Sequence, residues 1–502
     1  MDVNYIIIQA GGKGTRLNHL TANKPKGIVP VSNLPMIFHL MNKFPNKKFI
    51  IIGDYKYEVI EKYLEIFSPV EYMMVHAEEI GTCAGIKQAI SLIPKDESFL
   101  IIWSDLIVGN EFNLKGLKND TIGLSTDFSC RWSYINNKFI EEPSIDKGVA
   151  GCFIFKNKET ISDVPKSGEF VRWLQEKQLT FDIMNLYGTK EVGTILAYES
   201  TLNDNICRPF NSIEVNGDKI YKRGITEQGK KIAIYETNWY KAMSKKNYDR
   251  IPKIYSYDPL IMQKIDGVNI HKKVLSNKDK KNVILNLVNA LNELHSIDKI
   301  DTNFFDIYEN YYKKTIDRLN KVRDLIPFAN EEYININGEI CKNIFFYKKE
   351  FKNMIEKYLY DTNFVLIHGD CTFSNTLIDN RLNITFIDPR GYFGKTLLYG
   401  DEYYDWGKLY YSLIGNYDQF NSKHFLLDIF DNRVELKIDS NGYEELEEYY
   451  FSLIPNCNKK KIKLLHAIIW LSLTTYAWED YDSICGAFYK GLLCLKDFME
   501  DK

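Results

Sequence analysis

The order of apolar segments changes near residue 208 and divides the chain into two parts of different character. From residue 1 to about 205, short apolar segments alternate with helical patterns, which is typical of a mostly parallel sheet covered by helices. Strands are expected at 5–8, 48–52, 71–76, 99–103, 121–125 and 151–155, and helices near 35–44, 56–66 and 83–93. The first part is therefore predicted to be an α/β domain.

The second part opens with a small sheet and continues as a mainly helical region. Asn216-Gly217-Asp218 is a hairpin signal between two short apolar strands. Strands are expected at 213–215, 219–223, 254–257 and 260–264, and helices at 227–246, 278–296, 304–325, 345–360, 441–454 and 459–500. We therefore predict two domains, 1–207 and 208–502. The second domain should have two lobes, a small α+β lobe over 208–267 and a helical lobe over 268–502.

Composition narrows the functional class. The hydrophobic fraction of 45% and the charged fraction of 26% are normal for a globular protein. A net charge of −3 gives no reason to expect nucleic acid as a partner. No apolar run approaches the roughly 20 residues that span a bilayer, and the N-terminal apolar stretch is too short for a signal peptide. The nine cysteines form no Cys-x-x-Cys pair, so no zinc site is indicated. We expect a cytoplasmic protein with small-molecule partners and no membrane partner; a homo-oligomer stays open.

A glycine-rich turn follows the first apolar strand. Gly11, Gly12 and Gly14 belong to the sequence GGKGTRL, and a Lys-Pro-Lys segment follows, ending at Lys26. Glycine lets backbone N–H groups approach phosphates without obstruction by Cβ. Arg16 and Lys26 can neutralise triphosphate charge. A dinucleotide-binding loop would instead need G-x-G-x-x-G with an acidic residue about 20 positions later, which fits poorly. The turn therefore indicates a triphosphate site.

This stretch resembles the sugar-phosphate and choline-phosphate nucleotidylyltransferases, over roughly residues 1–200. The resemblance implies a Rossmann-like domain that couples a phosphate to a nucleoside triphosphate with Mg²⁺ and releases pyrophosphate. It assigns nucleotide binding to Gly11, Gly12, Gly14, Thr15, Glu79, Gly81 and Thr82. It places Arg16 on the β/γ-phosphates, Lys26 on the α-phosphate and the incoming phosphate, and Asp105 on the metal. Glu191 stands where the family has its second metal-binding aspartate.

Each assignment has a simpler alternative. Attack of one phosphate on another brings two anions together, so Mg²⁺ on carboxylates with Lys and Arg around it is physically sensible. Lys26 could still be a solvated surface lysine, and Asp105 could cap a helix. Trp103, Trp132 and Trp173 could enclose a quaternary ammonium group, but core packing is the favoured interpretation for each of them.

A second set of polar residues follows two apolar runs in the helical part. His368-Gly369-Asp370 comes after the run 364–367, Asn375 follows shortly, and Asp388 comes after the run 384–387. Phosphoryl transfer to a hydroxyl needs a carboxylate that orients the acceptor, and Asn and Asp that hold Mg²⁺ on the triphosphate. We expect the two apolar runs to pair as a hairpin and bring the three polar residues together.

These residues resemble the aminoglycoside phosphotransferase and choline kinase group, relatives of the protein kinases, over about 208–502. The resemblance implies a kinase-like fold that uses ATP and Mg²⁺. Asp370 would be the catalytic base, with Asn375 and Asp388 as metal ligands. Lys222 would grip the α/β-phosphates, with Glu236 as its ion-pair partner.

The same resemblance suggests further roles. Met262 would lie in the hinge beside adenine. The loop that covers the phosphates, near residues 208–212, is poor in glycine. His368 and Asp405 are expected to be structural.

Together, the two signatures predict a bifunctional enzyme with consecutive steps. The C-terminal domain would phosphorylate a choline-like or ethanolamine-like alcohol or a polyol with ATP. The N-terminal domain would couple that phosphate to CTP, giving a CDP-activated building block for cell-surface polysaccharide and pyrophosphate. The alternatives are a sugar-1-kinase joined to a UTP-dependent or other nucleotidylyltransferase, and one active domain joined to a nucleotide-binding module.

Overall fold

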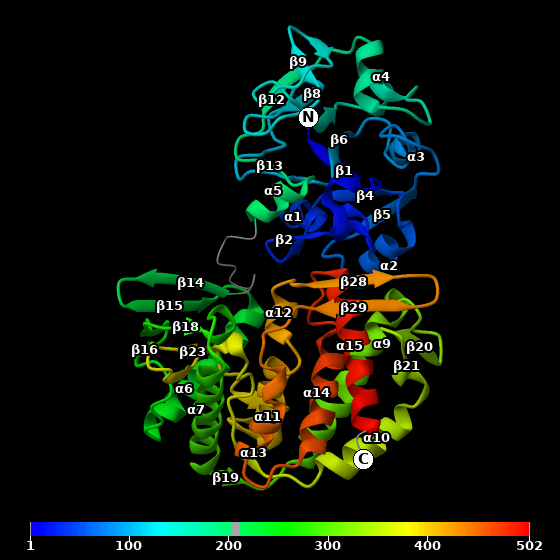
Figure 1. The fold of residues 1–502 in the computed structure, drawn as a ribbon. Coiled ribbons are helices and arrows are strands. Elements are labelled where there is room, and N and C mark those ends of the chain that lie inside the picture. Colours follow the sequence, from blue (N-terminus) through cyan, green and yellow to red (C-terminus); the bar gives the residue numbers. More distant parts are fainter. Residues whose placement is uncertain (1, 202–210, 501–502) are drawn as a thin grey trace. The chain divides into compact units, whose positions relative to one another are not determined.

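The computed structural model describes residues 2–201 and 211–500, which form two compact units (Figure 1). The first unit comprises residues 2–201 and the second nearly all of residues 211–500. The boundary predicted at 207/208 and the residues 208–210 of the predicted phosphate-covering loop lie outside the described residues. Within the described ranges, no helix combines the length and the apolar character that crossing a membrane requires.

A seven-stranded sheet forms the centre of the first unit, in the order β12-β8-β11-β6-β1-β4-β5. The strands are β1 (Val3–Gln9), β4 (Lys48–Gly53), β5 (Tyr72–His76), β6 (Ser98–Trp103), β8 (Thr121–Leu124), β11 (Val149–Phe155) and β12 (Asp182–Asn185). β11 runs antiparallel to both of its neighbours, and the other pairings are parallel. The predicted α/β domain with a mostly parallel sheet is confirmed.

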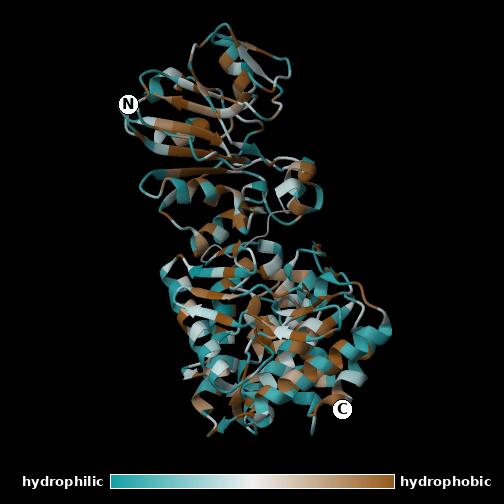
Figure 2. Ribbon diagram, turned by 90° about the vertical axis from the view of Figure 1, so that its left-hand side faces the viewer, coloured by the Kyte–Doolittle hydropathy of each residue, from teal (hydrophilic) through white to brown (hydrophobic). Residues whose placement is uncertain are grey.

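The central strands are nearly continuous buried apolar runs, as strands covered on both faces must be. Figure 2 shows hydrophobic residues concentrated along the strands of this sheet. The surrounding helices are α1 (Met36–Lys43), α2 (Tyr57–Phe67), α3 (Ile86–Ser91), α4 (Phe170–Glu176) and α5 (Ile195–Thr201). α2 buries Ile60, Tyr63 and Leu64, which share one helical face. Because β1 and β6 are parallel neighbours, the residues that follow their carboxyl ends meet at one edge of the sheet.

A four-stranded antiparallel sheet and one helix form the small lobe of the second unit. The strands are β14 (Asn211–Asn216), β15 (Lys219–Gly224), β16 (Ile254–Tyr257) and β17 (Leu260–Gln263), in the order β14-β15-β17-β16. Helix α6 (Glu227–Lys245) begins at Thr226, whose side chain accepts a hydrogen bond from Gly229 N at 3.0 Å. The predicted hairpin, helix and strand pair are all present.

The larger lobe is mainly helical. Its main helices are α7 (Asn277–Ser296), α9 (Lys314–Val322), α10 (Lys348–Leu359), α11 (Glu402–Leu413), α13 (Glu447–Leu453), α14 (Lys459–Leu473) and α15 (Tyr481–Glu500). The predicted single helix over 459–500 is wrong, because the chain leaves the helix between α14 and α15. An unbroken helix of that length would extend roughly 60 Å, far beyond the width of one lobe. The predicted helix over 304–325 is interrupted by a π-helical turn, Tyr308–Lys313.

The predicted pairing of the two apolar runs is also wrong. The first run forms β22 (Phe364–Leu366), which pairs with β19 (Lys299–Ile300) and β27 (Tyr399–Asp401). The second run forms β24 (Ile384–Phe386), which pairs with β23 (Thr376–Ile378). The loop between β23 and β24 is short, so this local hairpin costs less chain entropy than a long-range pairing.

A four-stranded sheet in the helical lobe was not predicted. It contains β20 (Tyr333–Ile336), β21 (Glu339–Lys342), β28 (Phe425–Ile429) and β29 (Val434–Ile438), in the order β21-β20-β29-β28. Asn337 and Gly338 have φ angles of 54° and 82°, the left-handed conformation of a tight hairpin turn. An Asn-Gly pair at a different place, Asn216-Gly217, was the sequence signal for the first hairpin.

Candidate active sites

The first site is a cavity of about 720 Å³ at the carboxyl ends of β1 and β6. Its lining includes the predicted residues Gly11, Gly12, Arg16, Lys26, Gly81, Thr82, Asp105 and Glu191. Gly14, Thr15 and Glu79 do not line it. Gly14 has a φ angle of 66° and its carbonyl accepts hydrogen bonds within the loop, so it shapes the turn. Thr15 and Glu79 are exposed.

Two cations face two carboxylates at the polar end of this cavity. Lys26 Nζ lies 2.7 Å from Asp105 Oδ2, and Arg16 Nη2 lies 3.3 Å from Glu191 Oε1. The short strands β7 (Leu106–Ile107) and β13 (Lys190–Glu191) pair and bring Glu191 beside Asp105. A Cβ atom at Gly193 would lie 2.7 Å from Asp105 Oδ2 and 2.2 Å from Glu191 Oε1. The two carboxylates therefore converge beside a glycine that leaves room for them.

The carboxylate pair fits a divalent cation. Asp105 Oδ1 is buried without a hydrogen-bond partner among the described residues. Burial, and then the charge of Asp105, raise the pKa of Glu191. A cation between the two groups would remove both penalties. Mg²⁺ typically binds one or two carboxylates together with substrate phosphates and water, so a set of two carboxylates is sufficient.

The segment after β5 is held tightly against the end of β1. Gln9 Nε2 donates to Thr82 O at 2.7 Å, and the hydroxyl of Thr82 accepts from Phe170 N at 2.8 Å. Gly81 has a φ angle of 104°, and a Cβ atom there would lie 2.3 Å from Gly168 O. Gln9 lines the cavity and was not predicted, although it ends the strand that precedes the glycine turn.

Gly81→Ala should loosen this segment. Both the positive φ and the contact with Gly168 O exclude a methyl group, and each such strain costs about 1–3 kcal/mol. Gly116 is the matched control, since its φ angle is 78° but it faces open space. We expect Gly81→Ala to accelerate hydrogen exchange in residues 77–84 and to weaken nucleotide binding, and Gly116→Ala to do neither. If both changes have the same effect, the strain comes from the positive φ angle alone, and the contact with Gly168 O contributes nothing.

The three tryptophans do not form an open aromatic cage. Trp132 lines the cavity, but its Nε1 donates to Glu169 Oε1 at 2.7 Å. The guanidinium groups of Arg131 and Arg172 lie 6.0 Å and 5.3 Å from its ring centre. Trp132 and Trp173 both belong to the hydrophobic core, and Trp103, which also lines the cavity, packs against it, in agreement with the favoured interpretation.

The second site is a cavity of about 350 Å³ in the second unit. Its lining includes the predicted residues Lys222, Glu236, Asp370, Asn375 and Asp388. The structure therefore brings this set together. Met262 is buried in β17 and is not part of this lining.

A buried ion-pair network links the small lobe to Asp388. Lys222 Nζ on β15 lies 2.9 Å from Glu236 on α6 and 2.7 Å from Asp388 Oδ1. Burial opposes the charge of Lys222, but the two carboxylates outweigh burial and raise its pKa. Asp388 has a φ angle of 56°, which is unusual outside glycine and tolerated best by Asn and Asp. Lys222 is therefore held fully charged in the cavity.

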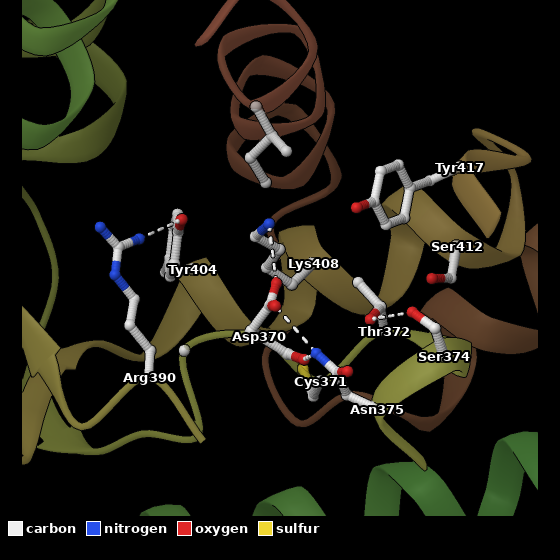
Figure 3. Close-up of polar contacts among 12 residues, drawn as sticks. Asp370, Cys371, Thr372, Ser374, Asn375, Arg390, Tyr404, Lys408, Ser412 and Tyr417 are labelled. Atoms are coloured by element: carbon white, nitrogen blue, oxygen red, sulfur yellow. Dashed lines mark hydrogen bonds and ion pairs between the residues drawn. The ribbon is translucent and has the colours of Figure 1, made fainter. Parts of the chain in front are cut away.

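Asp370 lies between two donors (Figure 3). Asn375 Nδ2 donates to Asp370 Oδ2 at 2.8 Å, and Lys408 Nζ on α11 lies 3.0 Å from Asp370 Oδ1. Ile387 N donates to Asn375 O at 3.0 Å, and this backbone bond joins the two loops without the predicted hairpin. Asn375 Oδ1 accepts no hydrogen bond from the described residues, and amide and carboxylate oxygens are ligands that Mg²⁺ prefers. Asn375 and Asp388 therefore fit a metal-bound triphosphate.

The loop that carries Asp370 is fixed by Asp405. The Asp405 carboxylate is fully buried and accepts hydrogen bonds from His368 N at 2.8 Å and Gly369 N at 2.7 Å. It also lies 3.1 Å from His295 Nε2. His368 Nδ1 accepts from Asp370 N at 3.2 Å, and burial lowers the pKa of His368. These contacts agree with the structural roles expected for both residues.

Asp405→Ala should destabilise the second unit. It leaves two buried N–H donors without an acceptor, at about 1–3 kcal/mol each. We expect faster hydrogen exchange in residues 364–388, with exchange in β1 and β6 unchanged. Asp431→Ala, at an exposed turn position, is the control. Wild-type exchange in Asp405→Ala would mean that other contacts hold the loop.

Two family models match this chain, one in the N-terminal part that contains the first cavity and one in the C-terminal part that contains the second. A model described as "Nucleotidyl transferase" matches residues 5–118, and one described as "Phosphotransferase enzyme family" matches residues 243–434. The Bifunctional protein GlmU of Methanococcus maripaludis is 33% identical over 104 residues, 20% of this chain and 24% of that protein. The Mannose-1-phosphate guanyltransferase of Saccharomyces cerevisiae is 27% identical over 180 residues, 33% of this chain and 48% of that protein. The matched regions thus span between about a quarter and about half of these curated relatives.

Solved structures match the N-terminal part. HddC from Yersinia pseudotuberculosis has 21% identity and a TM-score of 0.35, covering 40% of this chain and 98% of that chain. The CTP:phosphocholine cytidylyltransferase from Streptococcus pneumoniae has 18% identity and a TM-score of 0.33, covering 40% of this chain and 97% of that chain. On the two family matches, the chain joins an N-terminal nucleotidyl transferase domain to a C-terminal domain of the phosphotransferase enzyme family.

Proposed function

We propose that the two domains catalyse consecutive steps in the activation of a small alcohol. The observation that carries this proposal is the presence of two phosphate-handling cavities in one chain. One has Lys26 and Arg16 facing a carboxylate pair. The other has Asp370 beside the Lys222–Asp388 pair. The product of the C-terminal cavity is an alcohol phosphate, which is the nucleophile that the N-terminal cavity requires.

The first step is phosphoryl transfer from ATP. Asp370 Oδ accepts the hydrogen bond of the substrate hydroxyl and orients its oxygen toward the γ-phosphorus. A new O–P bond forms, the bond from the γ-phosphorus to the bridging oxygen breaks, and ADP leaves. The hydroxyl proton passes to Asp370. Lys222 contacts the α- and β-phosphates, held in place by Glu236.

The second step is nucleotidyl transfer. An oxygen of the new phosphate attacks the α-phosphorus of the nucleoside triphosphate, and pyrophosphate leaves as the α–β bridging bond breaks. Lys26 contacts the α-phosphate and the incoming phosphate, and Arg16 contacts the β- and γ-phosphates. When bound at Asp105 and Glu191, or at Asn375 and Asp388, Mg²⁺ would offset the charge of the respective triphosphate. The carboxylate pair Asp105 and Glu191 and the amide–carboxylate pair Asn375 and Asp388 are proposed ligands.

The finer substrate assignment is part of this proposal. The compact N-terminal domain supports CTP as its nucleotide, with a CDP-linked product for cell-surface polysaccharide. Several curated relatives are named as sugar-1-phosphate guanyltransferases, which supports a sugar or polyol as the substrate. The guanidinium groups against Trp132 argue against a choline-like amino alcohol.

Isotope tracing tests the coupled reaction. The full-length protein is incubated with ATP, one nucleoside triphosphate and a panel of amino alcohols, sugars, polyols and acidic alcohols. Label from [γ-³²P]ATP and from [α-³²P]CTP should both appear in one phosphatase-resistant product, and mass spectrometry should identify it. Label from [γ-³²P]CTP should appear in pyrophosphate only. Absence of any nucleotide-linked product with every pairing would contradict the coupling.

A further inference from the structure

The C-terminal cavity contains more cations than its carboxylates can pair. Lys314 and Arg318 on α9, Arg390 after β24 and Lys408 on α11 all line it, together with Lys222. The carboxylates in this lining are already engaged. Glu236 and Asp388 pair with Lys222, and Asp370 pairs with Lys408.

The other three cations hydrogen-bond only to neutral partners among the described residues, although the Asp370 carboxylate also attracts Arg390. Lys314 Nζ donates to Asn310 Oδ1 at 3.1 Å, and Arg390 Nη1 donates to the Tyr404 hydroxyl at 2.9 Å. Arg318 Nη1 donates to the carbonyl of Ser472. None of the three lies within the 4.0 Å that defines an ion pair with a carboxylate of the described chain. Three cations of the lining therefore have no carboxylate of their own, and the five cations outnumber the three carboxylates by two.

The side chains of Lys314, Arg318 and Arg390 are half-buried, and they have few hydrogen-bond partners. Burial, and then the charges of Arg390, Arg318 and Lys408, lower the pKa of Lys314. Among the residues that the structure describes, no group hydrogen-bonds to the buried Arg390 Nε. The same holds for the hydroxyl of Tyr411, whose side chain lines the cavity and is 1% exposed. Burying like charges without a counter-ion is costly, so such a cluster is stabilised when an anion binds.

We propose that the alcohol phosphorylated by this domain carries an anionic group, a carboxylate or a phosphate, that binds Lys314, Arg318 and Arg390. The proposal rests on the proposed kinase function and names its substrate class. The triphosphate of ATP is assigned to Lys222, Asn375 and Asp388, which are other residues of the lining. A cationic alcohol would meet only repulsion from the three unpaired cations.

Anion titration tests the cluster directly. The full-length protein is saturated with Mg²⁺ and β,γ-imido-ATP, which blocks the ATP phosphates, and is titrated calorimetrically with inorganic phosphate and separately with malonate. At least one anion should bind saturably, and Arg318→Gln should weaken it by about tenfold or more, as expected for a charge-assisted contact. The better of the two anions distinguishes phosphate from carboxylate.

Three further variants, Arg390→Gln, Arg318→Lys and Arg433→Gln, complete the test, and Arg390→Gln should weaken anion binding as Arg318→Gln does. Arg318→Lys keeps the charge and should retain most of the affinity. Arg433→Gln removes an exposed guanidinium that pairs with Glu435, and should bind as the wild type does. The proposal is overturned if neither anion binds saturably, or if Arg318→Gln and Arg390→Gln both bind with wild-type affinity.

The product assay separates this proposal from the kinase proposal. An acidic alcohol should be accepted, and Arg318→Gln should raise its KM about tenfold with little change in the KM for ATP. An accepted alcohol that is neutral or cationic would overturn the anionic substrate class but leave the kinase function intact. No accepted alcohol together with saturable anion binding would instead contradict the kinase function.

Discussion

Asp370→Asn is expected to lower the rate of ATP-dependent phosphorylation by about 10³-fold, the range of a lost catalytic base. Asparagine keeps the size of the side chain and can still accept the hydrogen bond from Asn375 Nδ2. It cannot take the hydroxyl proton, and it leaves Lys408 without its carboxylate. The measurement is the rate of ADP release with the accepted alcohol. Nucleotidyl transfer from the purified alcohol phosphate should stay at the wild-type rate.

The internal control for Asp370→Asn is the second half-reaction of the same molecule. Asp431→Asn, at an exposed turn position, controls for the loss of one negative charge in this domain. Hydrogen exchange in residues 364–388 reports whether the loop is still folded. A near wild-type rate of ADP release in a folded Asp370→Asn would mean that the Asp370–Lys408 pair is structural and that the base lies elsewhere.

Much of the fold could be predicted because most strands of the first unit are unusually easy to recognise. A strand buried on both faces needs a continuous apolar run, and 5–8, 48–52 and 99–103 are such runs. The missed elements follow weaker patterns. β28 and β29 have alternating buried and exposed residues, and the Asn-Gly turn before β21 lies in the interval between the predicted helices 304–325 and 345–360. Local pattern alone could not indicate that β20 pairs with β29, about a hundred residues away.

The site residues also include some that the sequence could predict and some that it could not. Residues in short loops after strands, such as Asp105 and Asp370, could be found from the sequence because the motif and the strand end coincide, and Lys26 could be found from its motif. Lys408 and Arg318 were missed, because a charged residue on a helix usually faces solvent. Their positions in the cavity depend on how α9 and α11 pack, which is a tertiary property. In the second domain, the sequence therefore indicates the type of reaction but not which residues line the substrate pocket.

Asp105→Asn is expected to lower nucleotidyl transfer by about 10²–10³-fold, the scale of a lost electrostatic contact to the developing charge. It halves the carboxylate pair that fits a divalent cation and leaves Lys26 Nζ facing a neutral amide. The Mg²⁺ concentration required for half-maximal rate should rise, while ADP release by the C-terminal domain stays unchanged. The measurement is pyrophosphate release with CTP and alcohol phosphate over a range of Mg²⁺ concentrations.

The Mg²⁺ dependence is the readout that separates a metal ligand from a structural ion pair. If Asp105 only holds Lys26 in place, the rate should fall without any shift in the Mg²⁺ requirement, and Lys26→Met should reproduce the same profile. Asp96→Asn, at an exposed turn, controls for the change in net charge. Glu191→Asp should retain the Mg²⁺ requirement of the wild type if a second carboxylate is all that the ion needs. If Asp105→Asn has neither effect, Asp105 is neither a metal ligand nor needed for nucleotidyl transfer.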